Sequence, residues 1–376
     1  MRLPLALLAA LLLGVPLLGA AARPAPQEDE PPTERELVAL HVRTLRSSKL
    51  ELNDKLDALE NLLELGTEGP RRAAGELDRI LAKERKAYEK DRARALRDAG
   101  KRAIKLVDAR LDRKGLAARD KARETLLRAS RSESLTKEEV KSICDPEIER
   151  LRGLLRVDRG QVEAAEPDLG TALADLEARA SDAALMADYF VRARAALAEG
   201  DRSAQRAAER LELPWDAADA LRELTEDLEF ALWTAPLSDG ERRVLTRNVE
   251  LASEVQPMEA EGNRLLNDIR MLAGLNPCLT DPKLCAAGRD HSKDMKERDF
   301  FSHDSPVEGK ETFGKRASNF GTSAHAENIA YGQRDAAGAI EAWWYSPGHH
   351  RNMMGGGHVR VGLGRHATHW TQLFGG

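Results

Sequence analysis

FFSH (residues 300–303), AENIA (326–330) and WWYSPGHHRN (343–352) are the stretches that decide how this chain of 376 residues folds. Each is a polar cluster set among apolar residues. Each carries one side chain that can bind a metal or move a proton near neutral pH, namely His303, Glu327 and His349. Isolated histidines would indicate little, but three such clusters in this order predict a shared cleft.

Further stretches extend the pattern on both sides. Asn267 and Arg270 precede GLNP (274–277), and VGLG (361–364) and WTQLFG (370–375) close the chain. From about residue 261 to the C-terminus the chain resembles the CAP superfamily, also called SCP-like domains, in its short bacterial form. The resemblance implies an α+β fold at the C-terminus. The implied fold is an α-β-α sandwich, in which helices cover both faces of a small antiparallel sheet.

The resemblance also implies a set of cleft residues. In the family, two histidines and two acidic residues face one another across a surface cleft, and in some members the histidines hold a divalent metal. Matching motifs assign the cleft to His303, Glu327 and His349, with His303 and His349 as ligands of a metal such as zinc. Two imidazoles make a weak site, since catalytic zinc usually has three protein ligands. The second acid is missing, because its position falls on Ser346 or Pro347.

Each of these residues also has an ordinary structural interpretation. His303 fits a histidine at the end of a helix whose ring is hydrogen-bonded to backbone groups. Glu327 fits a residue that caps a turn, and His349 fits an ordinary turn residue. Trp343 and Trp344 are expected to supply the core and one wall of the cleft. Four other histidines do not fall on cleft positions and are expected on the surface or in strands: His350, His358, His366 and His369.

Local patterns place the secondary structure of this region. Asp281 as N-cap and Pro282 at the first helical position predict one helix start. Ser346 and Pro347 predict another, so the Ser346 hydroxyl is expected to be structural rather than nucleophilic. The predicted elements are helices at about 260–272, 281–297 and 336–344, and strands at about 359–364 and 370–374.

The three cysteines fit an exported protein. Cys278 and Cys285 flank the predicted helix start closely enough to form a disulfide, which would persist in an oxidising compartment. Two buried, reduced thiols are the alternative. Cys144 has no obvious partner and is expected to be a small buried residue of a helix, with an intermolecular link as the second choice.

The N-terminus has the pattern of a secretory signal peptide. Residues 1–22 combine Arg2, an apolar run and the small residues AAA (20–22), and residues 23–32 form a flexible tether rich in Pro, Glu and Asp. No later segment is long and apolar enough to span a membrane. The expected location is secreted or extracytoplasmic, in a periplasm or at the cell envelope.

Residues 33–254 are rich in Ala, Leu, Arg and Glu, which predicts an all-α helical region, either a bundle or an array of hairpins. Capping boxes at Thr136 and Ser238 mark two helix starts. Lys and Arg recur in residues 83–131, but acidic residues are interleaved and aromatic residues are scarce, so nucleic acid is not an expected partner. Residues 256–376 are the predicted CAP-like domain.

Three classes of function remain open. The first is a non-catalytic extracytoplasmic module whose cleft recognises a lipid, an envelope polymer or a protein. The missing second acid and the absence of a recognisable nucleophile favour it. The second is a metal-dependent, peptidase-like hydrolase with Glu327 as base. In a third, the helical region is the binding part and the sandwich only stabilises it.

Overall fold

The computed structural model describes residues 31–132, 134–213 and 217–376. The predicted signal peptide at residues 1–22 and most of the predicted tether lie outside the described residues. The chain divides into two compact units. The first runs to Glu76 and includes Arg192–Leu211, and the second comprises Leu77–Val191 and Glu212–Gly376.

The first unit is helical. Leu56 and Leu59 of the second helix lie one turn apart, and both are buried. Within this unit Arg46 donates to the buried Glu76 through Nε at 3.0 Å. Its elements are α1 (Glu34–Arg46), α2 (Leu52–Leu63), the first turns of α3 (Glu68–Arg110), the end of α7 (Pro167–Ala198) and α8 (Arg202–Arg210).

The second unit begins with more helices. Besides parts of α3 and α7 it contains α4 (Arg113–Arg131), α5 (Lys137–Leu155), α6 (Arg159–Ala165), α9 (Ala217–Trp233) and α10 (Asp239–Leu251). Both capping boxes are present, with Thr136 and Ser238 as N-caps. Asp145 and Pro146 form a sequence pattern that predicts a break in the helix, but α5 continues through Pro146. The helical prediction for this region is confirmed.

The C-terminal part of the second unit has the following elements: α11 (Pro257–Leu272), β1 (Leu279–Thr280), α12 (Pro282–Glu297), α13 (Phe313–Asn319), β2 (Ala326–Tyr331), α14 (Ala336–Trp344), α15 (Pro347–Met353), β3 (Arg360–His366) and β4 (His369–Gly375). The strands form one sheet in the order β1-β3-β4-β2. β4 pairs antiparallel with β2 and β3, whereas β1 runs parallel to β3. The sheet is therefore mixed rather than purely antiparallel.

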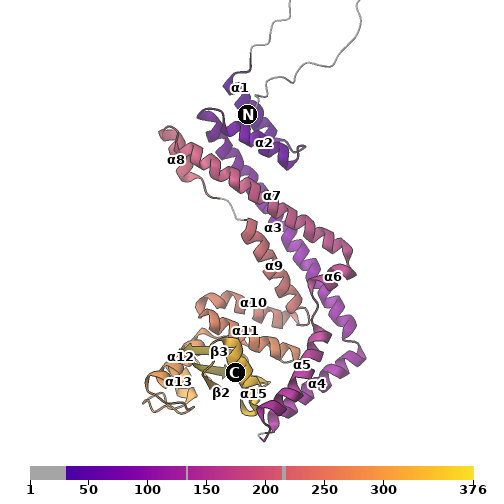
Figure 1. The fold of residues 1–376 in the computed structure, drawn as a ribbon, viewed down its shortest axis with the longest axis vertical. Coiled ribbons are helices and arrows are strands. Elements are labelled where there is room, and N and C mark those ends of the chain that lie inside the picture. The colour runs from indigo at the N-terminus through magenta and orange to yellow at the C-terminus, as the bar shows by residue number, and fades with distance from the viewer. Residues whose placement is uncertain (1–30, 133, 214–216) are drawn as a thin grey trace, which may run out of the picture. The chain divides into compact units, whose positions relative to one another are not determined.

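Helices cover both faces of this sheet, as the α+β prediction requires (Figure 1). On one face, Leu373 of β4 packs with Leu284 of α12 and residues of α13. On the other, Trp370 and Phe374 of β4 join the cluster that contains Trp343 of α14. Side chains that alternate along β4 thus enter two separate hydrophobic layers. The boundary at residue 256 stays a prediction, because the helical segments on either side of it belong to one compact unit.

Two glycines of β3 let α12 approach the sheet closely. A Cβ on Gly362 would lie 2.4 Å from backbone atoms of Leu284 and Cys285, and one on Gly364 would lie 1.9 Å from the backbone nitrogen of Arg289. Real Cβ atoms do not reach such distances, so any larger residue must push the helix and strand apart. The VGLG segment therefore sets how closely α12 packs on the sheet.

The cysteines do not form the predicted disulfide in this structure. Cys278 and Cys285 are free and buried, as is Cys144. Cys278 Sγ lies 3.8 Å from the carbonyl oxygen of His358, whereas Cys285 Sγ lies 3.8 Å from Nδ2 of Asn263. Burial raises the pKa of the Cys144 and Cys285 thiols to about 12, which keeps both in the protonated, unreactive form.

Among residues 31–132, 134–213 and 217–376, no helix is long and apolar enough to cross a membrane.

The glycine contact can be tested by mutation. Gly364→Ala should lower the free energy of unfolding by at least about 1–3 kcal/mol, because the new methyl group overpacks the α12–β3 contact. Gly356→Ala is the matched control, since a Cβ at Gly356 would meet nothing within 4 Å. Urea denaturation followed by circular dichroism measures both. Equal effects of the two substitutions would contradict the packing argument.

Candidate functional site

The predicted cleft residues lie around β2, an edge strand of the sheet. Glu327 of β2 stands opposite Leu373 of β4, which faces α12 and α13. The next residue, Asn328, stands opposite Gln372 and so points to the other face. The edge strand therefore offers one polar side chain to each layer of the sandwich.

Glu327 is buried, and both of its carboxylate oxygens are engaged. Oε1 lies 2.8 Å from Nδ1 of His303, and Oε2 accepts a hydrogen bond of 2.6 Å from Nη2 of Arg316. The Arg316 side chain is fully buried on α13. It also donates to the carbonyl oxygens of Lys310 and His303, at 2.9 and 3.0 Å. The guanidinium thus fixes both the carboxylate and the backbone of the loop that carries His303.

His303 lies in the loop between α12 and α13, and 51% of its side chain is exposed. The loop is fixed at two adjacent carbonyls, because His291 Nε2 lies 3.1 Å from the oxygen of Ser302 and Arg316 binds the oxygen of His303. The bond to Glu327 occupies Nδ1. Among the described residues, nothing hydrogen-bonds to Nε2 of His303, so this nitrogen is open to a ligand.

His349 lies in the first turn of α15 and is presented in a similar way. Its Nδ1 lies 2.9 Å from Oγ of Ser346, the N-cap residue of the helix. The helix start at Ser346 and Pro347 is confirmed, but the hydroxyl holds the imidazole and makes no capping bond. Burial, and then the neighbouring His303, lower the pKa of His349. A neutral imidazole is the form that binds a metal.

A chain of amides joins α15 to the sheet. Asn352 Nδ2 donates to Oδ1 of Asn328 at 2.8 Å and to the carbonyl oxygen of Glu327 at 3.1 Å. Asn328 Nδ2 donates to Oε1 of Gln372 at 3.0 Å and to the carbonyl oxygen of His349 at 3.4 Å. This chain holds the His349 turn against the strand that carries Glu327.

The other histidines do not join this group. His366 and His369 lie on strands, as predicted. The expected surface or strand position is wrong for His350 and His358, which are buried. The His350 ring centroid lies 4.0 Å from that of Trp344, and the His358 ring stacks on Phe374 with centroids 4.3 Å apart.

Both tryptophans of the 343–344 pair are buried, and Trp343 donates to the carbonyl oxygen of Ile329 at 2.9 Å.

The arrangement offers two imidazole Nε2 atoms and a carboxylate that is already paired. In the described part of the chain, no group of three or more His, Cys, Asp or Glu side chains is placed to hold a metal ion. A two-histidine site with His303 and His349 as protein ligands therefore stays a prediction. Glu327 fits the role of a group that orients a ligand histidine through its second nitrogen.

Comparison with known proteins defines the class of this domain. Residues 264–373 match the model of the CAP family, described as the cysteine-rich secretory protein family. The match covers the helices and strands that surround the His303, Glu327 and His349 group. The C-terminal part of the chain therefore carries a CAP domain, and the region before residue 264 has no match to this model.

Two curated relatives come from Bacillus subtilis (strain 168). The chain is 32% identical over 124 residues to the uncharacterized protein YkwD, covering 32% of this chain and 48% of that protein. It is 30% identical over 128 residues to the uncharacterized membrane protein YlbC, covering 34% of this chain and 36% of that protein. The chain thus spans about half or less of the relatives it matches.

A solved structure is also similar in sequence. It is an extracellular protein of Bacillus anthracis strain Ames that contains an SCP domain, and it is 31% identical to this chain. The match covers 31% of this chain and 40% of that one, with a TM-score of 0.30.

The buried Arg316–Glu327 pair yields a stability prediction. Arg316→Met should cost about 3–5 kcal/mol, because it leaves the Glu327 carboxylate buried without its charged partner. Combining it with Glu327→Gln should recover part of that loss. Lys315→Met is the control, because the Lys315–Glu311 pair is exposed and such pairs contribute at most about 1 kcal/mol. Chemical denaturation measures all four proteins, and a loss no larger than the control's would refute the pair's role.

His291 yields a prediction for pH. Burial lowers the pKa of His291 from 6.5 to about 4. Between these two values the unfolded chain binds more protons than the folded one, so stability falls as pH is lowered from 6.5 toward 4. His291→Gln keeps a donor near Nε2 but cannot titrate. Denaturation at pH 7.5, 6 and 5 should show a smaller loss in this variant, and identical pH slopes would rule out His291 as a contributor.

Proposed function

We propose that the CAP domain is a non-catalytic, extracytoplasmic ligand-binding module, in which His303, Glu327 and His349 line the recognition cleft. The observation that carries the proposal is which polar atoms of these side chains are already hydrogen-bonded and which are not. Both oxygens of Glu327 are engaged by His303 and Arg316, whereas the histidines keep Nε2 open. Such a cleft can present two imidazole Nε2 atoms to a ligand, while its one carboxylate is already bound by His303 and Arg316.

The cleft also suits weak binding of a divalent metal such as zinc. His303 and His349 would be the protein ligands, with Glu327 behind His303 as the orienting carboxylate. A bound metal would act as a Lewis acid that attracts an oxygen or nitrogen atom of the ligand. With two protein ligands, affinity is expected to fall well below that of structural zinc sites, which have four.

Export is part of the same proposal. The predicted signal peptide supports it, and the solved Bacillus anthracis relative is described as an extracellular protein. The helical region would then act outside the cytoplasm as a spacer or docking surface for the CAP domain. The ligand class that we propose for the cleft is a lipid, an envelope polymer or a protein.

Zinc titration of the full chain by calorimetry tests the cleft. Wild type should bind zinc saturably, and His303→Ala and His349→Ala should each weaken binding about tenfold or more. Glu327→Gln should also weaken it, because loss of an outer-shell partner typically costs about 10–100-fold. His366→Ala is the control, since His366 lies on β3 outside the cleft. Binding that survives both cleft substitutions would overturn the proposed site.

A separate assay distinguishes the alternative, a metal-dependent hydrolase that uses the same cleft. The zinc-loaded wild type should not cleave a library of quenched fluorescent peptides above the rate of its Glu327→Gln variant. Zinc-dependent cleavage by the wild type would refute the non-catalytic proposal, and its loss in Glu327→Gln at a zinc concentration that saturates both proteins would establish Glu327 as a base.

A further inference from the structure

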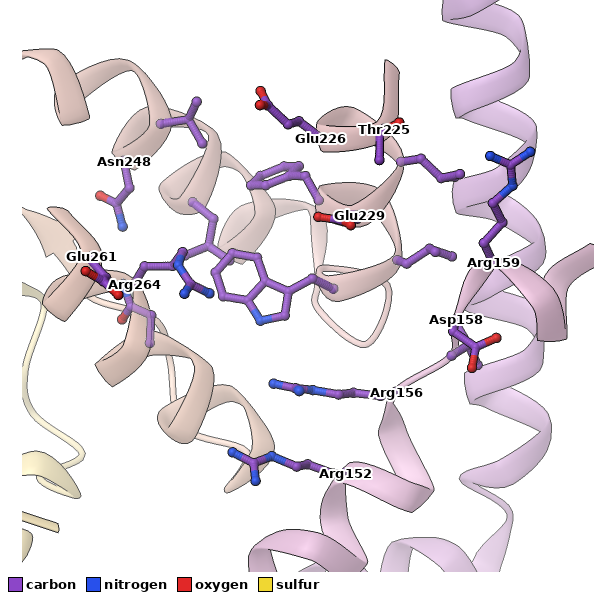
Figure 2. Close-up of a pocket in the computed structure, with 18 of the residues that line it drawn as sticks. Arg152, Arg156, Asp158, Arg159, Thr225, Glu226, Glu229, Asn248, Glu261 and Arg264 are labelled. Atoms are coloured by element: carbon purple, nitrogen blue, oxygen red, sulfur yellow. The ribbon is translucent and has the colours of Figure 1, made fainter. Parts of the chain in front are cut away.

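The second unit contains a pocket that none of the cleft residues lines. Its volume is about 1240 Å³, and it lies among the end of α5, the start of α6, and helices α9, α10 and α11 (Figure 2). Pockets for drug-sized ligands typically have about 300–1,000 Å³, so this one has room for an elongated molecule. Two groups of side chains, apolar residues and arginines, give the pocket its chemistry.

The apolar wall comes mainly from α9 and α10. Leu228, Leu232 and Leu245 line the pocket, and each is more than nine-tenths buried. Phe230 and Trp233 add two rings whose centroids lie 6.0 Å apart in an edge-on arrangement. These side chains offer no charged group, so they suit a hydrocarbon chain, which gains about 0.8 kcal/mol for each CH₂ group buried.

Arginines stand at one side of this wall. Figure 2 shows Arg152 and Arg156 extending from the end of α5 toward the part of the pocket where Arg264 of α11 lies. Arg264 has no hydrogen bond or ion pair with any described residue. Arg152 binds the exposed Glu149 through Nη1, and its Nη2 makes no hydrogen bond with any described residue. Both guanidinium groups therefore keep N–H donors without a protein partner.

The remaining charges of the lining are mostly committed. Arg156 pairs with Asp268, which also accepts a bond of 2.9 Å from Nε1 of Trp233. Asp158 caps α6, and Glu226 pairs with Arg222. Arg159 pairs with two glutamates and stands on the far side in Figure 2. Two exposed glutamates, Glu229 and Glu261, complete the charged lining.

We propose that this pocket binds an anionic amphiphile, a molecule with a carboxylate or phosphate head and an alkyl chain. The head would accept hydrogen bonds from Arg152 and Arg264, because the guanidinium fork matches the geometry of both anions. The chain would lie along Leu228, Leu232 and Leu245. An anion without a chain would leave the apolar wall bare, and a neutral alkane would leave the free arginine donors unused.

The test uses the full chain and three probes, each below its micelle concentration: sodium decanoate, decyl phosphate and decyltrimethylammonium bromide. Calorimetric titration measures binding. Decanoate, decyl phosphate or both should bind saturably, and the comparison between them identifies the preferred head group. The cationic probe should bind at least about tenfold more weakly than the better anion. Equal binding of anion and cation, or no binding of either anion, would overturn the proposal.

Variants locate the binding. Arg264→Glu should weaken the better anionic probe by about tenfold or more, since it replaces an attraction with a repulsion. Arg243→Glu on α10 makes the same charge change at an exposed residue that does not line the pocket, and it should leave binding unchanged. Val249→Trp, at a lining residue that is 63% exposed, should obstruct the pocket without disturbing the core. Unchanged binding in both Arg264→Glu and Val249→Trp would contradict the assigned pocket.

Discussion

The buried ion pair between Arg316 and Glu327 is the contact on which the geometry around His303 depends. Both side chains are almost completely buried, so neither charge can be solvated by water, and each needs the other. Because Arg316 also binds the carbonyl oxygen of His303, one guanidinium fixes the carboxylate, the loop and, through the carboxylate, the imidazole. The orientation of His303 therefore follows from a residue with no access to solvent.

The position of His349 on α15 depends on packing against the helical region. α15 packs on α4, and Tyr345, just before α15, donates to Oδ1 of Asp145 on α5 at 2.9 Å. Asn248 of α10 binds the unpaired edge of β1, where its Nδ2 donates to the carbonyl oxygen of Cys278 and its Oδ1 accepts from the amide of Thr280. The helical segments of the second unit thus contact the sandwich directly and help to hold its position.

Much of this fold could be predicted from the sequence because it is encoded locally. Capping residues, such as Thr136 and Asp281, mark helix starts through bonds made within one turn. Contacts between residues far apart in the sequence could not be predicted in this way. Nothing in the segment FGKRASN distinguishes Arg316, which is buried, from Lys315, which is exposed. The pairing of Arg316 with Glu327 depends on where α13 meets β2, and only the fold determines that.

The two candidate sites differ in what the family match can say about them. His303, Glu327 and His349 all lie within residues 264–373, so the CAP match covers the whole cleft. Of the residues that line the second pocket, only Arg264, Asn267 and Thr280 lie in that range. Arg152, Arg156 and the leucines of α9 and α10 lie outside it. Because the pocket forms where helical segments pack against α11, the CAP match alone does not account for it, and the proposed ligand rests on residues of this chain.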